Sequence, residues 1–389
     1  MAKTKKKVNV ALIGYRFMGD AHSNAYLRVA KHFDVPAEPV MSVLCGHKKS
    51  GKDLEDTAAR WGWQRVERDW RKVVDDPEID VVDICTPNDT HAEIAVAAAK
   101  AGKIVFCEKP LALDVAEAKK MADAVKRSKK PSLVWFCYRF TPALQLARRI
   151  VEEKRIGRIY HFRAQYLQDW IADPNFPLLW RMNKKVAGSG AHGDINAHII
   201  DMGRFLVGEL DTVSATMETF VKERPLPESG GGLSGKGKKK KGKVTVDDAV
   251  LAMARFKNGA LGSFEATRFA HGRKNANGFE LFGEKGSLAF NFERMNELEF
   301  FDATQPKHLQ GWTRILATEP EHSYMEGYWP PGHIIGYEHG FVNALVDAMT
   351  VIGKGRGKLA PNMDDGLACQ KVLAAMEQSA GSGRWVKVK

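Results

Sequence analysis

The chain lacks the features that mark membrane, disulfide-bonded and metal-binding proteins. No apolar run reaches the roughly 18 residues of a membrane span. Only five of the 389 residues are cysteines, and no Cys-x-x-Cys pair occurs, which indicates neither a disulfide framework nor a zinc site. The basic residues 1–7 precede a short apolar run without a small-residue cleavage site, so a first β-strand is favoured over a signal peptide. We expect a cytoplasmic protein without a bound metal.

Acidic residues are fewer than basic ones. The chain has 59 lysines and arginines and 47 aspartates and glutamates, which gives a net charge of +12. Four of the positive charges lie within residues 3–7 and six within residues 236–243. Subtracting these ten lysines from +12 leaves +2. The remainder is nearly neutral, which argues against a nucleic-acid partner and favours a small-molecule substrate.

The first 141 residues alternate between apolar, strand-like runs and helix-like segments. Strands are expected at 8–13, 40–45, 79–85, 104–107 and 133–138, and helices at 20–31, 53–61, 92–101 and 114–128. This alternation predicts an α/β Rossmann domain for dinucleotide binding over residues 1–141.

Residues 142–389 change pattern and predict a substrate-binding α+β domain with a large, mostly antiparallel sheet. Alternating runs favour strands at 159–166, 213–221, 249–256, 260–268, 278–282 and 298–301. Helix-like stretches at 143–154, 194–206 and 338–350 are expected on one face, leaving the open face as a candidate dimer or tetramer interface. The glycine- and lysine-rich range 225–243 predicts a mobile loop. A C-terminal helix over 363–379 is expected to return toward the first domain.

A glycine-rich turn follows the first predicted strand and opens a helix, as in dinucleotide-binding loops. Its candidate cofactor-binding residues are Gly14, Arg16, Phe17, Met18 and Gly19. Arg16 replaces the usual middle glycine and could meet phosphate charge.

The turn after the second predicted strand carries Gly46, His47 and Lys48 where NAD enzymes usually have an acid. The cations there favour NADP weakly over NAD. A solvated turn is an equally good interpretation, so NAD or NADP stays open.

Two further motifs follow predicted strands at their carboxyl ends, where α/β sheets bind ligands. Thr86, Pro87 and Asn88, with His91, follow the third strand, and Glu108 and Lys109 follow the fourth. We expect these residues to contact the cofactor. Lys109 is also a candidate catalytic residue, although a lone lysine is usually solvated.

Asp194 and His198 are four residues apart after a glycine-rich stretch, so a helix would place them on one face. A carboxylate one turn from an imidazole suits a general base. A satisfied surface pair is the commoner meaning of this spacing. Candidate substrate-binding residues are Tyr138, Arg139, Tyr166, Asp169, Trp180, Arg181 and Asn196. Packing or ion-pair roles fit each of them equally well.

Together these motifs resemble the glucose–fructose oxidoreductase / inositol dehydrogenase / MocA family, and the closing Asp365-Gly366-Leu367 fits too. Residues 168–181 are similar to levoglucosan and glycoside 3-dehydrogenases. The resemblance implies hydride transfer between NAD(P) and a secondary hydroxyl of a sugar, anhydrosugar, glycoside or cyclitol. Lys109 matches the family's Glu-Lys-Pro lysine, and Asp194 and His198 match its acid and histidine.

The implied mechanism gives His198 the role of general base, oriented by Asp194, while Lys109 stabilises the developing alkoxide. One alternative is a cofactor-recycling glycoside hydrolase of the same family, which would use the same residues. A second alternative is a non-catalytic nucleotide sensor, which would not need a base.

Overall fold

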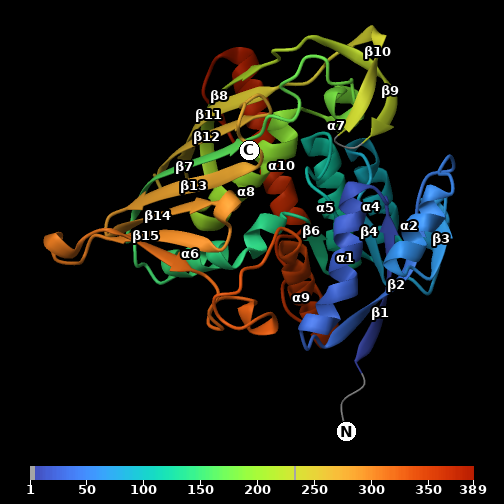
Figure 1. Cartoon of the computed structure of the whole chain (residues 1–389), viewed down its shortest axis with the longest axis horizontal. Coiled ribbons are helices and arrows are strands. Elements are labelled where there is room, and N and C mark those ends of the chain that lie inside the picture. Colours follow the sequence, from blue (N-terminus) through green and yellow to red (C-terminus); the bar gives the residue numbers. More distant parts are fainter. Residues whose placement is uncertain (1–4, 232–233) are drawn as a thin grey trace. The chain divides into compact units, whose positions relative to one another are not determined.

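The computed structural model describes residues 5–231 and 234–389, which divide into two compact units (Figure 1). Unit 1 combines the chain up to Cys137 with Gly336–Ala368, and unit 2 combines Tyr138–Ile335 with Cys369–Lys389. Residues 1–4 of the predicted basic start and 232–233 of the predicted loop lie outside the described residues. None of the described helices is both long and apolar enough to cross a membrane.

Unit 1 contains a six-stranded sheet in the order β3-β2-β1-β4-β5-β6, with every neighbouring pair parallel. Its strands are β1 (Lys6–Ile13), β2 (Ala37–Cys45), β3 (Arg65–Glu67), β4 (Val81–Ile84), β5 (Ile104–Cys107) and β6 (Ser132–Val134). The strand order reverses between β1 and β4, and a crevice for ligands opens at such a point. The predicted Rossmann architecture is confirmed. The strand predicted over 133–138 is too long, because the backbone turns into a 3₁₀ helix at Cys137–Phe140.

Helices cover this sheet by burying apolar side chains on one side of each helix. They are α1 (Phe17–His32), α2 (Asp53–Trp61), α3 (Trp70–Asp75), α4 (His91–Lys100), α5 (Val115–Ser128) and α9 (His339–Lys354). Helix α1 packs against α9, and α4 packs against α5. The range 336–368 therefore belongs to unit 1, whereas the prediction assigned it to the second domain.

Unit 2 contains a nine-stranded sheet in the order β16-β15-β14-β13-β7-β12-β11-β8-β17. Its strands are β7 (Ile159–Leu167), β8 (Leu210–Glu218), β11 (Ala249–Phe256), β12 (Leu261–Thr267), β13 (Ala276–Gly283), β14 (Gly286–Asn291), β15 (Glu297–Asp302), β16 (Trp312–Leu316) and β17 (Val386–Lys387). Every neighbouring pair is antiparallel except β12 with β7. The predicted large, mostly antiparallel sheet is confirmed, although β14, β16 and β17 are additional.

The core of unit 2 lies between this sheet and the helices α6 (Pro142–Glu152) and α8 (Ala197–Leu206). Alternation along β7 buries Phe162, which packs on Phe264 and Phe279 from the two neighbouring strands. Gly203 permits the close approach of α8, because a Cβ there would lie 3.1 Å from the Phe162 ring. Helix α10 (Met363–Ser382) begins in unit 1 and continues in unit 2.

The range predicted as a loop, 225–243, instead forms a hairpin, so that prediction is wrong about secondary structure. Strands β9 (Glu223–Gly231) and β10 (Ser234–Lys243) pair antiparallel. The base of the hairpin is anchored by Arg224, which is fully buried and donates to the carbonyls of Ile171 (2.5 Å) and Asp173 (2.8 Å). A charged donor that reaches backbone acceptors gives this glycine- and lysine-rich segment an attachment that its composition does not reveal.

Candidate active site

The glycine-rich turn of unit 1 has the geometry of a dinucleotide loop. Gly14 has φ +103°, and a Cβ there would lie 2.6 Å from the carbonyl oxygen of Cys85. A Cβ on Gly19 would lie 2.4 Å from the carbonyl oxygen of Gly14. Both positions therefore require glycine, and α1 begins at Phe17 with its N-terminal amides at the turn. A helix start of this kind favours phosphate.

Arg16 is directed to a carboxylate within unit 1. Its Nη2 lies 2.8 Å from Asp53 Oδ2, and the Tyr15 hydroxyl donates to the same oxygen at 3.0 Å. Asp53 is the first residue of α2, so an acid does lie near the glycine-rich turn, although it comes eight residues after the end of β2. Met18 is partly buried and Phe17 is exposed beside this turn.

The turn after β2 is exposed and cationic, as its sequence predicts. His47, Lys48 and Lys49 are exposed, and the His47 amide donates to Ser50 Oγ at 2.9 Å. A Cβ on Gly46 would lie 2.6 Å from Ser50 Oγ, so the turn is packed tightly on its inner side.

The motifs that follow β4 and β5 are joined by a buried histidine. His91 Nε2 lies 3.0 Å from the Thr86 carbonyl, and Nδ1 lies 3.2 Å from the Pro110 carbonyl. Burial lowers the pKa of His91, although the nearby carbonyls oppose this effect. Lys109 is partly buried, and its amide donates to its neighbour Glu108 at 3.1 Å. Pro87 is exposed and Asn88 partly buried at the start of the first motif.

In unit 2, Asp194 and His198 lie on consecutive turns but in different kinds of helix. Asp194 is in a π-helical turn, His192–Asn196, which leads into α8, where His198 lies. The turn is fixed by Asp247, whose carboxylate accepts from the amides of Gly190 and His192, both at 2.7 Å. These hydrogen bonds fix the backbone of the turn that carries Asp194, one turn before His198.

The side chain of Asp194 meets a buried arginine, and His198 lies against two tyrosines. Arg268 is 1% exposed and donates from Nη2 to Asp194 Oδ2 at 2.5 Å. The His198 ring centroid lies 4.5 Å from the ring of Tyr138 and 6.0 Å from that of Tyr166. The two tyrosine hydroxyls are 2.6 Å apart. The predicted residues Tyr138, Tyr166 and His198 are therefore brought together.

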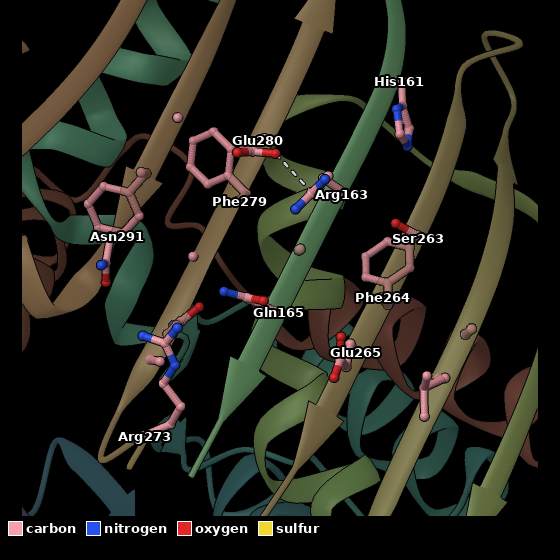
Figure 2. Close-up of a pocket in the computed structure, with 18 of the residues that line it drawn as sticks. His161, Arg163, Gln165, Ser263, Phe264, Glu265, Arg273, Phe279, Glu280 and Asn291 are labelled. Carbon is pink, nitrogen blue, oxygen red and sulfur yellow. Dashed lines mark ion pairs between the residues drawn. The ribbon is translucent and has the colours of Figure 1, made fainter. Parts of the chain in front are cut away.

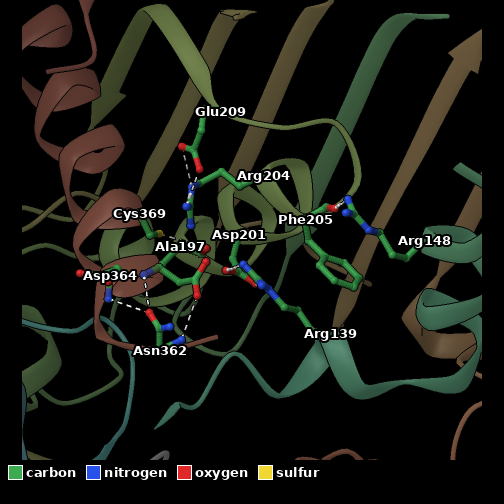
Figure 3. Close-up of polar contacts among 11 residues, drawn as sticks. Arg139, Arg148, Ala197, Asp201, Arg204, Phe205, Glu209, Asn362, Asp364 and Cys369 are labelled. Carbon is green, nitrogen blue, oxygen red and sulfur yellow. Dashed lines mark hydrogen bonds and ion pairs between the residues drawn. The ribbon is translucent and has the colours of Figure 1, made fainter. Parts of the chain in front are cut away.

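Two other predicted polyol contacts have side chains engaged inside unit 2. Arg139 forms a bidentate ion pair with Asp201, with both N···O distances at 2.6 Å (Figure 3). Asn196 is fully buried, and its Nδ2 lies 3.1 Å from His192 Nδ1. The ion pair and packing interpretations left open by the sequence fit these two residues best.

The remaining predicted polyol contacts are partly buried on the segment that follows β7. Asp169 is 2.8 Å from Lys274 Nζ, and this hydrogen bond, together with the amide of Gly272, lowers the pKa of Asp169. The guanidinium of Arg181 lies 4.4 Å from the centre of the Trp180 ring. An aromatic face and charged groups therefore occur along one segment of unit 2.

Comparison with known proteins places both units in one family. Residues 8–136 match the oxidoreductase family with an NAD-binding Rossmann fold, and residues 144–289 match the GFO/IDH/MocA C-terminal domain. The levoglucosan dehydrogenase of Pseudarthrobacter phenanthrenivorans is 47% identical over 98% of each chain. The chain belongs to the GFO/IDH/MocA oxidoreductase family.

Solved structures agree along the whole length of the chain. A levoglucosan dehydrogenase in complex with NADH and levoglucosan is 46% identical, with a TM-score of 0.93 over 99% of this chain and 100% of that one. An oxidoreductase domain protein from Kribbella flavida is 50% identical, with the same TM-score over 99% and 100%. The chain is thus an NAD-dependent dehydrogenase, and its relatives include dehydrogenases of levoglucosan and of inositol. The turn at Gly14 fits the tight turn of a dinucleotide loop, because a Cβ there would collide with the Cys85 backbone.

Several residues in contact with the site are not identified by the sequence analysis. In unit 2 they are Arg268 and Asp247, and in unit 1 they are Asp53, His22 and Asp83. Arg268 follows β12 by one residue, and only the register of the sheet brings it to Asp194. A possible set of metal ligands in unit 1 consists of His22, Asp83 and Cys85. However, the Asp83 oxygen and the Cys85 sulfur lie 2.9 and 3.0 Å from His22 Nδ1, which are hydrogen-bond distances.

Proposed function

We propose that this dehydrogenase oxidises a secondary hydroxyl of an anhydrosugar of the levoglucosan type, with Lys109, Asp194 and His198 as its catalytic residues. The observation that carries the proposal is the contact of His198 with Tyr138 and Tyr166 next to the Asp194 turn. The similarity to a levoglucosan dehydrogenase that binds levoglucosan supports the substrate class.

Each catalytic residue has a separate role in this proposal. His198 removes the hydroxyl proton as general base, and the aromatic rings around it restrict its orientation. Asp194, which is ion-paired with Arg268, supplies negative charge that favours the imidazolium formed. Lys109 supplies positive charge to the developing alkoxide. The bound nicotinamide supplies the hydride acceptor. Tyr138 and Tyr166 offer hydroxyls to the sugar.

The remaining polyol contacts in the proposal lie on the segment after β7. Trp180 offers an aromatic face for the C–H surface of a sugar, while Asp169 and Arg181 offer groups for its hydroxyls. This division suits a ligand with alternating polar and apolar faces.

The proposed cofactor site combines the two strand-end motifs with the glycine-rich turn and the turn after β2. Its residues are Gly14, Arg16, Phe17, Met18, Gly19, Gly46, His47, Lys48, Thr86, Pro87, Asn88, His91, Glu108 and Lys109. The absence of an acid within the turn after β2 supports acceptance of NADP as well as NAD. Asp53 opposes this, because its carboxylate would repel a 2′-phosphate near Arg16.

Substitution of Asp53 tests the choice of cofactor. Asp53→Asn should raise kcat/KM for NADP relative to NAD by about tenfold, the equivalent of about 1.4 kcal/mol. Asp56→Asn is the matched control, since Asp56 lies on the same helix but pairs with Lys52. An unchanged ratio in Asp53→Asn would show that this carboxylate does not read the 2′ position.

The enzymatic proposal is tested with a panel of anhydrosugars, pyranoses and inositols, read by the absorbance of reduced cofactor. Levoglucosan should give the highest kcat/KM. Lys109→Ala and His198→Ala should each lower kcat by about 10²–10⁴-fold, the usual range for acid–base groups. Turnover near that of the wild type in either variant contradicts the assignment. Release of an aglycone from a glycoside without net reduced cofactor would instead support the hydrolase alternative.

We also infer that the open face of the nine-stranded sheet binds a second copy of the chain. This face carries a groove of 820 Å³ lined mainly by side chains of β7, β11, β12 and β13 (Figure 2). Leu251 and Met253 on β11 are 52% and 57% exposed beside it. Arg163 and Glu280 pair across it at 2.9 Å, so one face offers both charge signs and apolar surface. Such a face can complement itself about a two-fold axis.

A further inference from the structure

A buried histidine in unit 1 lies between two carboxylates and has no role in the mechanism above. His22 is on α1 and is fully buried. Its Nδ1 lies 2.9 Å from Asp83 Oδ2, and its Nε2 lies 3.1 Å from Glu108 Oε1. The imidazole packs on Trp135, with ring centroids 4.1 Å apart. The ring is therefore fixed by hydrogen bonds at both nitrogens and by an aromatic face.

Hydrogen bonds to both carboxylates require the His22 ring to be protonated on both nitrogens. A neutral imidazole has only one N–H, so it can donate to only one of the two acids. Burial by itself lowers the pKa of His22, but the charge and hydrogen bonds of Asp83 and Glu108 outweigh this effect and raise the pKa to about 9. At neutral pH His22 then carries a positive charge between the two acids.

Four other described side chains face His22, and none of the four donates a hydrogen bond to Glu108. The hydroxyl of Tyr26, one turn along α1, donates to Asp83 Oδ2 at 2.9 Å, and Trp135 Nε1 donates to Asp83 Oδ1 at 2.9 Å. Cys85 Sγ lies 3.0 Å from His22 Nδ1, and burial raises the pKa of this thiol, which stays protonated. Phe341 from α9 contributes only an aromatic ring. His22 therefore provides the positive charge in this network.

The network ends at the backbone of Lys109. Glu108 is 5% exposed and comes directly after β5. One of its oxygens accepts from His22, and the other, Oε2, accepts from the Lys109 amide at 3.1 Å. On the other side of Lys109, the Pro110 carbonyl contacts His91. The backbone around Lys109 is thus held by two buried histidines, one directly and one through Glu108.

We propose that His22 is a positioning residue for Lys109: its Nε2 hydrogen bond orients Glu108, so that Glu108 fixes the Lys109 backbone. The proposal rests on the catalytic role assigned to Lys109 above. Without the hydrogen bond from His22, Glu108 Oε1 loses its donor, and the carboxylate that accepts from the Lys109 amide is no longer held in one orientation. A displacement of about 1 Å at a catalytic group lowers the rate by about 100-fold. The effect is expected on kcat, because His22 lies in the interior of unit 1.

The test is a double-mutant cycle of His22→Gln and Glu108→Gln, each assayed for kcat, for KM of NAD and for Tm. His22→Gln should lower kcat between about 10- and 100-fold and leave KM for NAD within about threefold. Both substitutions act on the same hydrogen bond, so the double variant should lose no more kcat than the slower of the two single variants. Losses in kcat that simply multiply in the double variant would overturn the proposal.

Tyr26→Phe is the matched control, since it removes a hydrogen bond to Asp83 without touching Glu108. It should lower Tm while kcat and its pH profile stay as in the wild type. In the wild type, kcat should fall as pH rises through about 9, and this fall should be absent from the profile of His22→Gln. A His22→Gln variant with wild-type kcat and an inactive Lys109→Ala variant overturn the positioning role alone. Wild-type kcat in both overturns the catalytic role of Lys109 as well.

Discussion

Breaking the buried ion pair between Arg139 and Asp201 separates a structural role of Arg139 from a role in sugar binding. Both side chains are almost inaccessible, with 8% and 2% exposed, and the guanidinium donates two hydrogen bonds of 2.6 Å to the carboxylate (Figure 3). Arg139→Ala leaves the Asp201 carboxylate buried and deprives it of this bidentate donor. Loss of one partner from such a pair costs about 3–5 kcal/mol of stability. For a unit of about 200 residues, this corresponds to a fall in Tm of roughly 6–20 °C.

The assay is calorimetry on the whole chain, together with KM for the sugar at a temperature where both proteins are folded. Arg139→Ala should lower the Tm of unit 2 and leave KM for the sugar within about twofold, the equivalent of about 0.4 kcal/mol. The double variant Arg139→Ala with Asp201→Ala should be more stable than Arg139→Ala alone, because the Asp201 carboxylate is no longer left buried without its bidentate donor. The reasoning is refuted if Arg139→Ala keeps the wild-type Tm while KM rises severalfold, since Arg139 would then act on substrate.

Three other perturbations follow from the same structure. The free energy of unfolding of unit 1, measured by urea titration, should fall by about 3 kcal/mol as pH rises from 6.5 to above 9. The reason is that His22 in the folded chain keeps a proton that the unfolded chain has already lost. The His22→Gln variant should lack this fall. Arg224→Ala should lower the Tm of unit 2, since it frees the hairpin from the segment after β7, whereas deletion of residues 230–235 should leave Tm and kcat unchanged. Met253→Asp should convert the oligomer to a monomer, as measured by light scattering. Leu309→Asp is the control and should not, because Leu309 is exposed but lies outside the groove. A monomeric wild type would contradict the proposed interface.

Local patterns predict most of unit 1, because parallel strands are short, apolar and separated by helices. The helix over Asp53–Trp61 and the strand over Ile104–Cys107 agree with the structure at both ends. The turn chemistry of Gly14 and Gly19 is also local, since each depends on backbone that a Cβ would displace. Features of this kind depend on a few consecutive residues and can be recognised in one sequence.

Features that depend on long-range register could not be predicted. Arg268 meets Asp194 across 74 positions of the chain, and His22 meets Glu108 across 86. The β9–β10 hairpin has no apolar alternation, and the buried side chain of Arg224 helps to anchor it. Burial of a charged residue is disfavoured without a partner, so it cannot be expected until the partner is known.

The division of unit 1 into two separate stretches of chain has a consequence for how this protein is made. Helix α9 packs on α1 and β2, and Gly353 comes so close to Pro36 that a Cβ there would lie 2.7 Å from its carbonyl carbon. A ribosome completes the first stretch, ending at Cys137, about 200 residues before it reaches α9. The apolar surface that α9 covers therefore stays exposed on the nascent chain while Tyr138–Ile335, the first stretch of unit 2, is made. A fragment ending near residue 141 would retain this uncovered surface permanently, and it should aggregate rather than bind nucleotide as an isolated domain.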